Sequence, residues 1–177
     1  MQDELLDEYN EKGEVIGTVY KAIAHKEGRW HRAVHVWILN GKNEILLQYR
    51  SKEKSVYPDT WDASFAGHVG AGESSLDALI REGREELGLS VDTDKLCYLF
   101  TSRERLPYGK LDNNELADVY LLRQEVDLEA SVLQAEEVAD AKFFSLEEFF
   151  AMTKTDALVP HALEYTALKH FLLSEGL

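Results

Sequence analysis

Acidic side chains and an arginine gather within one short segment of this 177-residue chain, between residues 67 and 89. The residues that define the segment are Gly67, Glu73, Arg81, Glu82, Glu85, Glu86 and Gly88. Three carboxylates within about one and a half helical turns repel one another, by roughly a few tenths of a kcal/mol per pair. A bound Mg²⁺ or Mn²⁺ removes that repulsion, because hard cations bind carboxylate oxygens and leave positions for water and phosphate. A divalent-metal site and a solvated acidic helix face both fit this spacing, and such a run taken by itself is more often a solvated face.

A helix is predicted over residues 74–87, because its apolar residues recur at helical spacing. The apolar stripe that is expected to face the core consists of Leu76, Leu79, Ile80 and Leu87. The carboxylates of Glu82, Glu85 and Glu86 are then expected on the face away from the core. Gly83 falls within the stripe and predicts a close approach by another backbone, since a helical glycine costs about 1 kcal/mol relative to alanine. Gly88 is expected to end the helix.

Strands are predicted from apolar and alternating runs. They cover residues 14–24, 33–39, 44–50, 61–69, 96–102 and 117–122. A turn at residues 10–13 makes the first of them part of an N-terminal hairpin. Asn40-Gly41 lies between two apolar runs and predicts a second hairpin. The last two strands are expected to be separated by a polar loop over residues 103–115.

Two further helices are predicted toward the C-terminus. Ser145-Leu146-Glu147-Glu148 matches a capping box that opens a short helix, and a last helix covers roughly residues 160–173, starting at a proline. Strands followed by interleaved helices predict an α/β fold, an α+β mixed sheet with helices on both faces. The length suits a single domain over residues 1–177, with the N-terminal hairpin as an extension.

The segment 67–89 resembles the Nudix signature. The match consists of Gly67, Glu73, Arg81-Glu82, Glu85-Glu86, Gly88 and Leu89. Gly83 departs from the family, which usually has an aliphatic residue there. The resemblance implies a Nudix-type α-β-α sandwich and a hydrolase that acts on phosphoanhydride bonds. It also implies that Glu82, Glu85 and Glu86 ligate Mg²⁺ or Mn²⁺, that Arg81 orients a carboxylate, and that a glutamate deprotonates the attacking water.

The implied reaction is hydrolysis of a diphosphate linkage by water, in which the metals neutralise phosphoryl charge and lower the pKa of bound water. The expected substrate is a nucleoside diphosphate derivative or a similar small molecule. Arg50 and Lys54 lie between a strand and the signature and are candidate substrate-binding cations, with ordinary surface cations as the alternative. Tyr57 and Tyr108, in loops outside the signature, could stack on a base, although exposed tyrosines are common.

Outside the signature, the chain resembles the isopentenyl-diphosphate isomerase branch of the Nudix proteins. The matching stretches are residues 10–17, Ala24-His25, Trp30-His31, residues 46–51, Lys54, Pro58, Trp61 and Gly67-His68. In those isomerases three histidines and two glutamates bind a second metal. The histidines match His25, His31 and His68, and one glutamate matches Glu115. Asn113 stands where the other acidic residue is expected.

Three departures argue against isomerase activity. Ala66 stands where the branch uses a cysteine, and Cys97 is too far along the chain to replace it. The tryptophan that the branch places late in the chain is also missing, because the tryptophans here are Trp30, Trp37 and Trp61. The hydrolase signature, which isomerases usually degrade, is intact. A hydrolase is therefore predicted, with the isomerase as the alternative; a non-catalytic ligand-sensing domain would need a partner module for which the chain has no room.

The histidines leave two interpretations open. His25, His31 and His68 form either an inherited metal site or the polar lining of a substrate cleft. His35 alternates within an apolar strand and is expected in the core, whereas His161 and His170 are expected on the surface of the last helix. Glu115 follows the polar loop and is the leading candidate for an additional metal ligand or general base, against a surface glutamate.

The charge of the chain restricts its partners. Nineteen Lys+Arg against 33 Asp+Glu give a net charge of −14, which disfavours nucleic acid and anionic membranes but allows phosphates held through a metal. The single Cys97 excludes an internal disulfide and a thiolate zinc cluster. Residues 1–11 are acidic and lack the apolar core of a signal peptide, so none is expected, and no apolar run approaches the roughly 18 residues that span a bilayer. A cytoplasmic protein is expected, and a homodimer is left open.

Overall fold

The computed structural model describes residues 3–177. Within these residues the strands are β1 (Leu5–Tyr9), β2 (Val15–Tyr20), β3 (Trp30–Leu39), β4 (Glu44–Arg50), β5 (Trp61–Asp62), β6 (Phe65–His68), β7 (Leu96–Tyr108), β8 (Leu111–Arg123) and β9 (Val138–Ser145). The helices are α1 (Lys21–Glu27), α2 (Ser75–Leu87), α3 (Leu146–Met152) and α4 (Ala162–Ser174), with a 3₁₀ turn at Thr93–Lys95. None of these helices combines the length and the apolar character that a membrane crossing requires.

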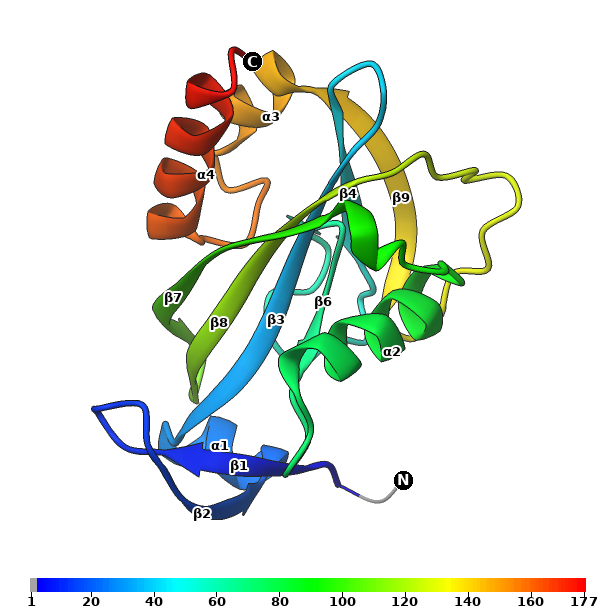
Figure 1. The fold of residues 1–177 in the computed structure, drawn as a ribbon. Helices are drawn as coiled ribbons and strands as arrows, with labels where there is room; N and C mark the ends of the chain where they lie inside the picture. The colour runs from blue at the N-terminus through cyan, green and yellow to red at the C-terminus, as the bar shows by residue number, and fades with distance from the viewer. Residues whose placement is uncertain (1–2) are drawn as a thin grey trace.

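Strand β3 organises one mixed sheet. It runs parallel to β8 from the pair Trp30–Asn114 to the pair Leu39–Arg123, and it pairs antiparallel with β1, β4 and β6. Strand β7 lies beyond β8, while β5 and β9 pair with β4. Figure 1 shows α2 on one side of this sheet and α3 and α4 on the other. The expected α-β-α architecture with a mixed sheet is confirmed.

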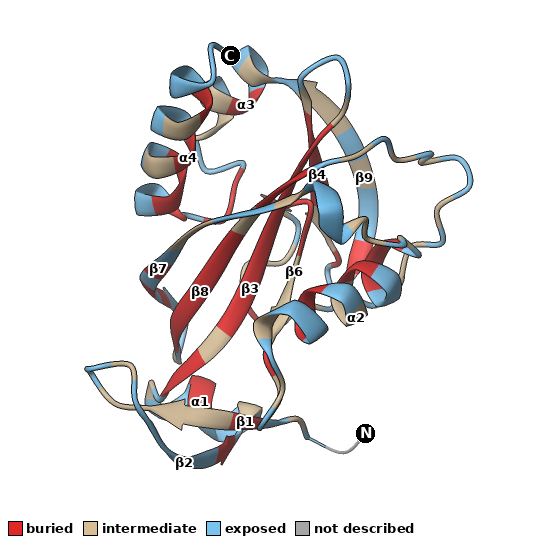
Figure 2. Ribbon diagram, in the orientation of Figure 1, coloured by how far each residue is buried: buried red, intermediate tan, exposed pale blue. Residues whose placement is uncertain are grey.

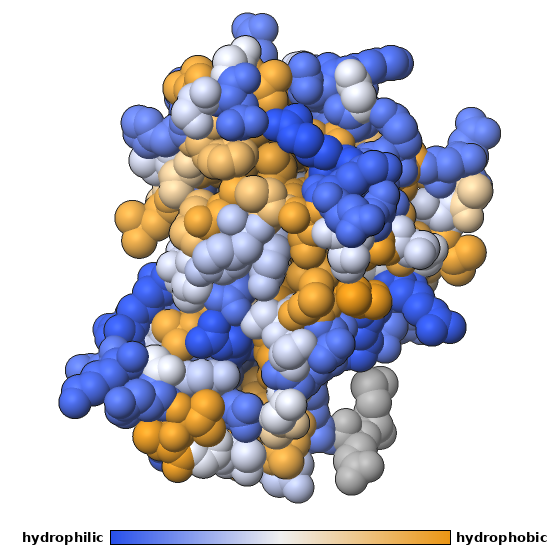
Figure 3. Space-filling view, in the orientation of Figure 1, coloured by the Kyte–Doolittle hydropathy of each residue, from blue (hydrophilic) through white to orange (hydrophobic). Residues whose placement is uncertain are grey.

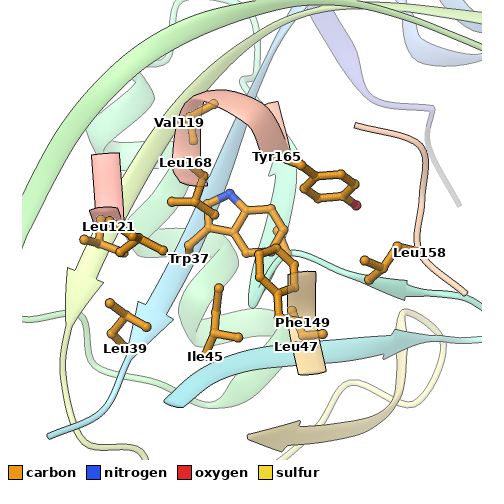
Figure 4. Close-up of a cluster of buried hydrophobic side chains, with 12 residues drawn as sticks. Trp37, Leu39, Ile45, Leu47, Val119, Leu121, Phe149, Leu158, Tyr165 and Leu168 are labelled. Atoms are coloured by element: carbon orange, nitrogen blue, oxygen red, sulfur yellow. The ribbon is translucent and has the colours of Figure 1, made fainter. Parts of the chain in front are cut away.

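Two hydrophobic cores lie on the two faces of the sheet, because alternate residues of a strand point to opposite faces. Trp37 and Leu39 pack beneath α3 and α4 together with Phe149, and Figure 4 shows this cluster. Val36 and Ile38 pack on the other face, against α2. Strands β3 and β8 are buried over most of their length (Figure 2). The polar side chains on these two strands are therefore held in a rigid setting.

Local signals in the sequence were reliable at turns and caps. The hairpin β1–β2 and the turn at Asn40 are present. Ser145 caps α3 through a complete capping box, and Gly88 ends α2 with a φ of 63°. Element ends differ: the predicted strand 14–24 ends at Tyr20 because α1 follows, and the predicted strand 61–69 is two short strands. The sequence also missed β9.

The polar loop predicted over residues 103–115 is wrong. Strands β7 and β8 continue through it and meet in a tight turn at Gly109. Ser102, Glu104 and Leu106 are buried while their neighbours are exposed. The alternation typical of a strand is thus carried by polar residues, which a hydrophobic pattern does not detect. As a consequence, Glu104 lies directly opposite Glu115.

The predicted orientation of α2 is also wrong in part. Leu76 and Ile80 are 44% and 40% exposed, and Figure 3 shows apolar surface over this helix. Leu79 and Leu87 are buried as expected, but Glu86 is buried with them. The side of α2 that packs against the sheet therefore includes Glu86 and is rotated away from Leu76 and Ile80. Gly83 does allow a close approach, but by side chains, because an added Cβ would lie 3.0 Å from Val91 and 3.1 Å from Phe65.

Candidate active site

A cleft of about 420 Å³ opens where β3, β6 and β8 meet α2 and the loop after β4. The predicted site residues that line it are Arg50, Lys54, Arg81, Glu82, Glu85, Glu86, His25, His68 and Glu115. His31 is fully buried beside His25 and His68. The fold thus brings together the acidic, basic and histidine residues that the sequence had singled out for metal and phosphate binding.

Arg81 ties the loop before α2 to the helix itself. Its Nε and Nη2 donate to the two carboxylate oxygens of Glu73 at 3.0 and 2.9 Å, and Nη2 also donates to the backbone oxygen of His68 at 2.9 Å. These bonds lower the pKa of Glu73. Nη1 donates to Glu82 Oε1 at 2.5 Å and to Glu85 Oε2 at 3.4 Å. Arg81 therefore fixes where the carboxylate of Glu82 points.

Glu82 lies against the backbone of β6 at Gly67. A Cβ added to Gly67 would lie 2.0 Å from Glu82 Cδ, so the glycine provides the space that the carboxylate occupies. Burial raises the pKa of Glu82 to about 7, although the charge of Arg81 opposes this shift. This close approach explains the glycine at position 67, fifteen residues before Glu82, because a side chain there would occupy the space of the Glu82 carboxylate.

Glu86 is the most deeply buried carboxylate of α2, at 3% exposure. Its Oε2 accepts hydrogen bonds from Gln48 Nε2 at 3.1 Å and from the backbone N–H of Ala66 at 3.3 Å. Burial raises the pKa of Glu86 to about 8, while Lys54 lowers it and Glu82 raises it further. Glu85 differs, because its side chain is 52% exposed. Glu86, which is buried, and Glu82, whose side chain is 12% exposed, are costly to ionise beside the cleft unless a cation compensates them.

Three histidines form a compact, nearly symmetrical group. The ring centroids of His25, His31 and His68 lie 5.1 to 5.2 Å apart, and Nε2 of His25 lies 3.2 Å from Nε2 of His68. His31 Nδ1 contacts the backbone oxygen of Arg29 at 3.0 Å, whereas its buried Nε2 has no hydrogen-bond partner among the described residues. Burial lowers the pKa of His25 to about 4 and that of His68 well below its usual value. Neutral imidazoles with converging nitrogens have the chemistry of metal ligands.

Glu115 completes this group from β8. Its Oε1 lies 3.9 Å from His31 Nε2 and 3.8 Å from His68 Nε2, and it accepts a hydrogen bond from Asn113 Nδ2 at 2.8 Å. Oε2 lies 3.6 Å from His35 Nε2. Burial opposes ionisation, but the contact with His35 outweighs it and holds the pKa of Glu115 well below its usual value. Glu115 is therefore an ionised, buried carboxylate that faces three imidazoles.

The prediction that His161 lies on the surface is wrong. His161 is 2% exposed; its Nδ1 bonds to Glu104 and its Nε2 lies 3.1 Å from Asp62 Oδ1. Burial lowers the pKa of His161, but the contacts with the two carboxylates raise it by more than that, so that it lies at about 10. Sequence reasoning missed Glu104 and Asp62 as well, because their partners are 57 and 99 residues away. The predictions that His35 is buried and His170 exposed are confirmed.

Replacing His161 by glutamine is expected to destabilise the protein by about 3–5 kcal/mol, because two buried carboxylates lose their cation. The stabilisation by His161 is complete below the pKa of the unfolded imidazole and is lost as the pH rises through about 10. Urea unfolding at pH 7 measures the effect. His170→Gln, at an exposed position of α4, should stay within about 0.5 kcal/mol of the wild type. Equal stability of the two variants would contradict the ion-pair assignment.

The two predicted phosphate-binding cations already have partners. Arg50 donates to Asp62 Oδ2 at 2.8 Å and to the backbone oxygens of Val56 and Tyr57, and Lys54 forms an ion pair with Glu137. Tyr57 contacts Tyr108 with a centroid distance of 4.9 Å. Arg50 thus shapes the loop at the mouth of the cleft.

Comparison with known proteins shows which family and which structures this chain resembles. A protein-family model described as NUDIX domain matches residues 29–166. Nudix hydrolase 3 of Arabidopsis thaliana is 38% identical over 169 residues, which cover 91% of this chain and 22% of that relative. The isopentenyl-diphosphate Delta-isomerase of Escherichia coli is 33% identical over 150 residues, covering 84% of this chain and 80% of the isomerase. The crystal structure of DR0079 from Deinococcus radiodurans has the same fold, with a TM-score of 0.69 at 24% identity over 94% of this chain and 98% of that one.

Proposed function

The chain belongs to the Nudix hydrolase family, and we propose that it is a metal-dependent pyrophosphohydrolase that cleaves the diphosphate linkage of a nucleoside diphosphate derivative or a similar small molecule. One observation carries the proposal. Glu82, Glu85 and Glu86 lie together at a cleft, and the low exposure of Glu82 and Glu86 makes both costly to ionise without a cation.

Each residue of α2 has a proposed role. Glu82, Glu85 and Glu86 would hold Mg²⁺ or Mn²⁺, since these ions bind carboxylate oxygens and keep coordination positions free. A bound cation supplies charge neutralisation at the phosphoryl oxygens and a lower pKa for water. Arg81 holds Glu82 in the orientation that ligation needs, by the 2.5 Å contact to its Oε1. The catalytic contribution of Arg81 is therefore to position a ligand.

Arg50 and Lys54 are proposed to bind the phosphates of the substrate. A guanidinium has five N–H donors, and three of those of Arg50 are engaged within the protein. These bonds hold the positively charged guanidinium of Arg50 at the cleft, with or without a bound substrate. Lys54 would exchange Glu137 for a phosphate oxygen, because both are anionic partners of an ammonium group.

A second metal is proposed at His25, His31, His68 and Glu115. The unpartnered Nε2 of His31 supports this, because a buried nitrogen without a hydrogen bond is costly unless a ligand engages it. Three imidazoles and one carboxylate favour a transition metal such as Mn²⁺ or Zn²⁺ over Mg²⁺. Glu115 is then an additional metal ligand, and its low pKa keeps it ionised at neutral pH.

The test is turnover of a mixed panel: nucleoside di- and triphosphates, nucleotide sugars, dinucleotide cofactors and isopentenyl diphosphate, with Mg²⁺ or Mn²⁺. Products are identified by mass. Cleavage of one phosphoanhydride bond, dependent on the metal, is the expected result and names the substrate class. Absence of turnover of every phosphoanhydride, with a folded protein and either metal, would overturn the proposal.

Gly67→Ala is expected to lower kcat about 100-fold, because a methyl group 2.0 Å from Glu82 Cδ must displace that carboxylate, and a misplacement of about 1 Å can cost that much. Steady-state kinetics and Tm are measured together. Gly17→Ala is the control, since nothing lies within 4 Å of its added Cβ. A wild-type kcat in Gly67→Ala would show that turnover does not depend on where the carboxylate of Glu82 lies.

The second candidate is isopentenyl-diphosphate isomerase, which the relative from Escherichia coli favours. That reaction protonates a carbon–carbon double bond, and the methyl group of Ala66, which lines the cleft, has no proton to give. His161 and Asp62 also line the cleft and make this part of it charged. An assay in heavy water decides the matter: deuterium in dimethylallyl diphosphate without phosphate release would favour the isomerase, and its absence excludes it.

A further inference from the structure

We infer that Glu164 and His35 are positioning residues that orient Glu115 toward His31 and His68 of the histidine group. This inference rests on the proposed second metal at His25, His31, His68 and Glu115. It adds two residues that the Nudix signature does not contain, one of them on the C-terminal helix α4.

Glu164 is a charged side chain in an unusual place. It lies on α4 and is 0% exposed. Its Oε2 lies 2.8 Å from His35 Nδ1, and its Oε1 accepts a hydrogen bond of 2.5 Å from Trp37 Nε1. A buried carboxylate is costly, so it is retained where its partners need it. Here its two partners are alternate residues of β3 that share a face of the sheet.

His35 passes this contact on to Glu115. Its Nδ1 faces Glu164 and its Nε2 lies 3.6 Å from Glu115 Oε2. Both nitrogens of the ring are therefore directed at carboxylates, which fixes the orientation of the ring. His31 and His35 lie on the same face of β3, so the chain Glu164–His35–Glu115 reaches the histidine group without crossing the sheet.

The two oxygens of Glu115 have separate partners. Oε2 faces His35, while Oε1 lies within 3.9 Å of the Nε2 atoms of His31 and His68 and also accepts a hydrogen bond of 2.8 Å from Asn113 Nδ2. A carboxylate that is held at one oxygen presents the other in a fixed direction. Partners of this kind behind a metal ligand typically contribute 10–100-fold to metal affinity.

The second ion-pair network has different partners. His161 contacts Glu104 and Asp62 but has no contact within hydrogen-bond or ion-pair distance to Glu115 among the described residues. Its ring lies 4.8 Å from that of His35, in an edge arrangement. The direction of Glu115 Oε2 is therefore assigned to Glu164 and His35, whereas Asn113 bonds to Oε1 and His161 contacts the ring of His35.

The test is a titration of the full chain with Co²⁺, followed by the visible absorption of a histidine-bound ion. Glu164→Gln is expected to weaken Co²⁺ affinity 10–100-fold, because glutamine cannot serve as anionic acceptor for both His35 and Trp37. Trp37→Phe is the control: it removes the other hydrogen bond of the same carboxylate and leaves His35 in contact, so affinity should change less than about threefold. His35→Gln gives a second measurement if Glu164→Gln does not fold, with the same loss expected.

The outcomes are distinguishable. Wild-type affinity in folded Glu164→Gln or His35→Gln would overturn the inference alone. Equal losses in Glu164→Gln and Trp37→Phe would also overturn it, since they would show a structural role. No histidine-bound Co²⁺ in the wild type would overturn both the second metal and the inference, while Mg²⁺-dependent hydrolysis reports separately on the α2 carboxylates.

Discussion

Glu86→Gln is expected to fold like the wild type and to lose at least about 1,000-fold in kcat, equal to about 4 kcal/mol of transition-state stabilisation. Glutamine fills the same space and keeps an oxygen that can accept from Gln48 and the backbone of Ala66. It removes the anionic ligand charge that a divalent cation requires. Steady-state turnover of the substrate found in the panel measures the loss, and the Tm measures folding.

The matched control is Glu147→Gln, an exposed glutamate in the first turn of α3. It changes the net charge by the same amount, far from the cleft, and its kcat should stay within about twofold of the wild-type value. Comparable activity in Glu86→Gln and Glu147→Gln would place the chemistry elsewhere and remove the α2 carboxylates from the mechanism.

The apparent affinity for Mg²⁺ is expected to rise at least about 50-fold between pH 6 and pH 8, because Glu86 alone accounts for that factor and Glu82, whose pKa burial raises to about 7, adds to it. Burial raises the pKa of Glu86 to about 8 in the metal-free protein, so that about 1% of it is ionised at pH 6 and about half at pH 8. The cation must displace this proton to bind. Isothermal titration at several pH values, in buffers of different ionisation enthalpy, measures both the affinity and the protons released.

The same shift has a consequence for stability. A carboxyl whose folded pKa lies above its unfolded value stabilises the fold while it is protonated, and that contribution is lost as the pH rises from about 4.5 to about 8. The metal-free protein should therefore lose Tm over this range, and saturating Mg²⁺ should restore it. In metal-free Glu86→Gln the Tm should fall less between pH 4.5 and pH 8, because the contribution of Glu86 is missing. The same fall in Tm as in the wild type would show that other groups cause it.

The proposed catalytic segment could be recognised from sequence because its parts are close along the chain. Arg81, Glu82, Glu85 and Glu86 belong to one helix, whose N-terminal cap at Ser74 and C-terminal glycine are local signals. The side of α2 that packs against the sheet was predicted less well. Periodicity places residues around a helix axis but does not say which arc meets the sheet, and Leu76 and Ile80 were wrongly assigned to the core.

The ion-pair networks could not be predicted, because they depend on contacts between distant segments. Glu164 on α4 looks like an ordinary surface residue in a helical pattern, yet it is fully buried between His35 and Trp37. The pairing of β7 with β8 likewise makes Glu104 a buried residue. Burial of a charged group is decided by the partner that neutralises it, and that partner lies outside any local window.

Strand β6 contributes to both groups of potential metal ligands with consecutive residues. The backbone at Gly67 receives Glu82, and His68 belongs to the histidine group. Neighbouring Cα atoms are about 3.8 Å apart whatever surrounds them. The separation between the carboxylate group and the imidazole group is thus tied to covalent geometry. Changes in the loops around the cleft therefore leave the covalent distance between residues 67 and 68 of β6 unaltered.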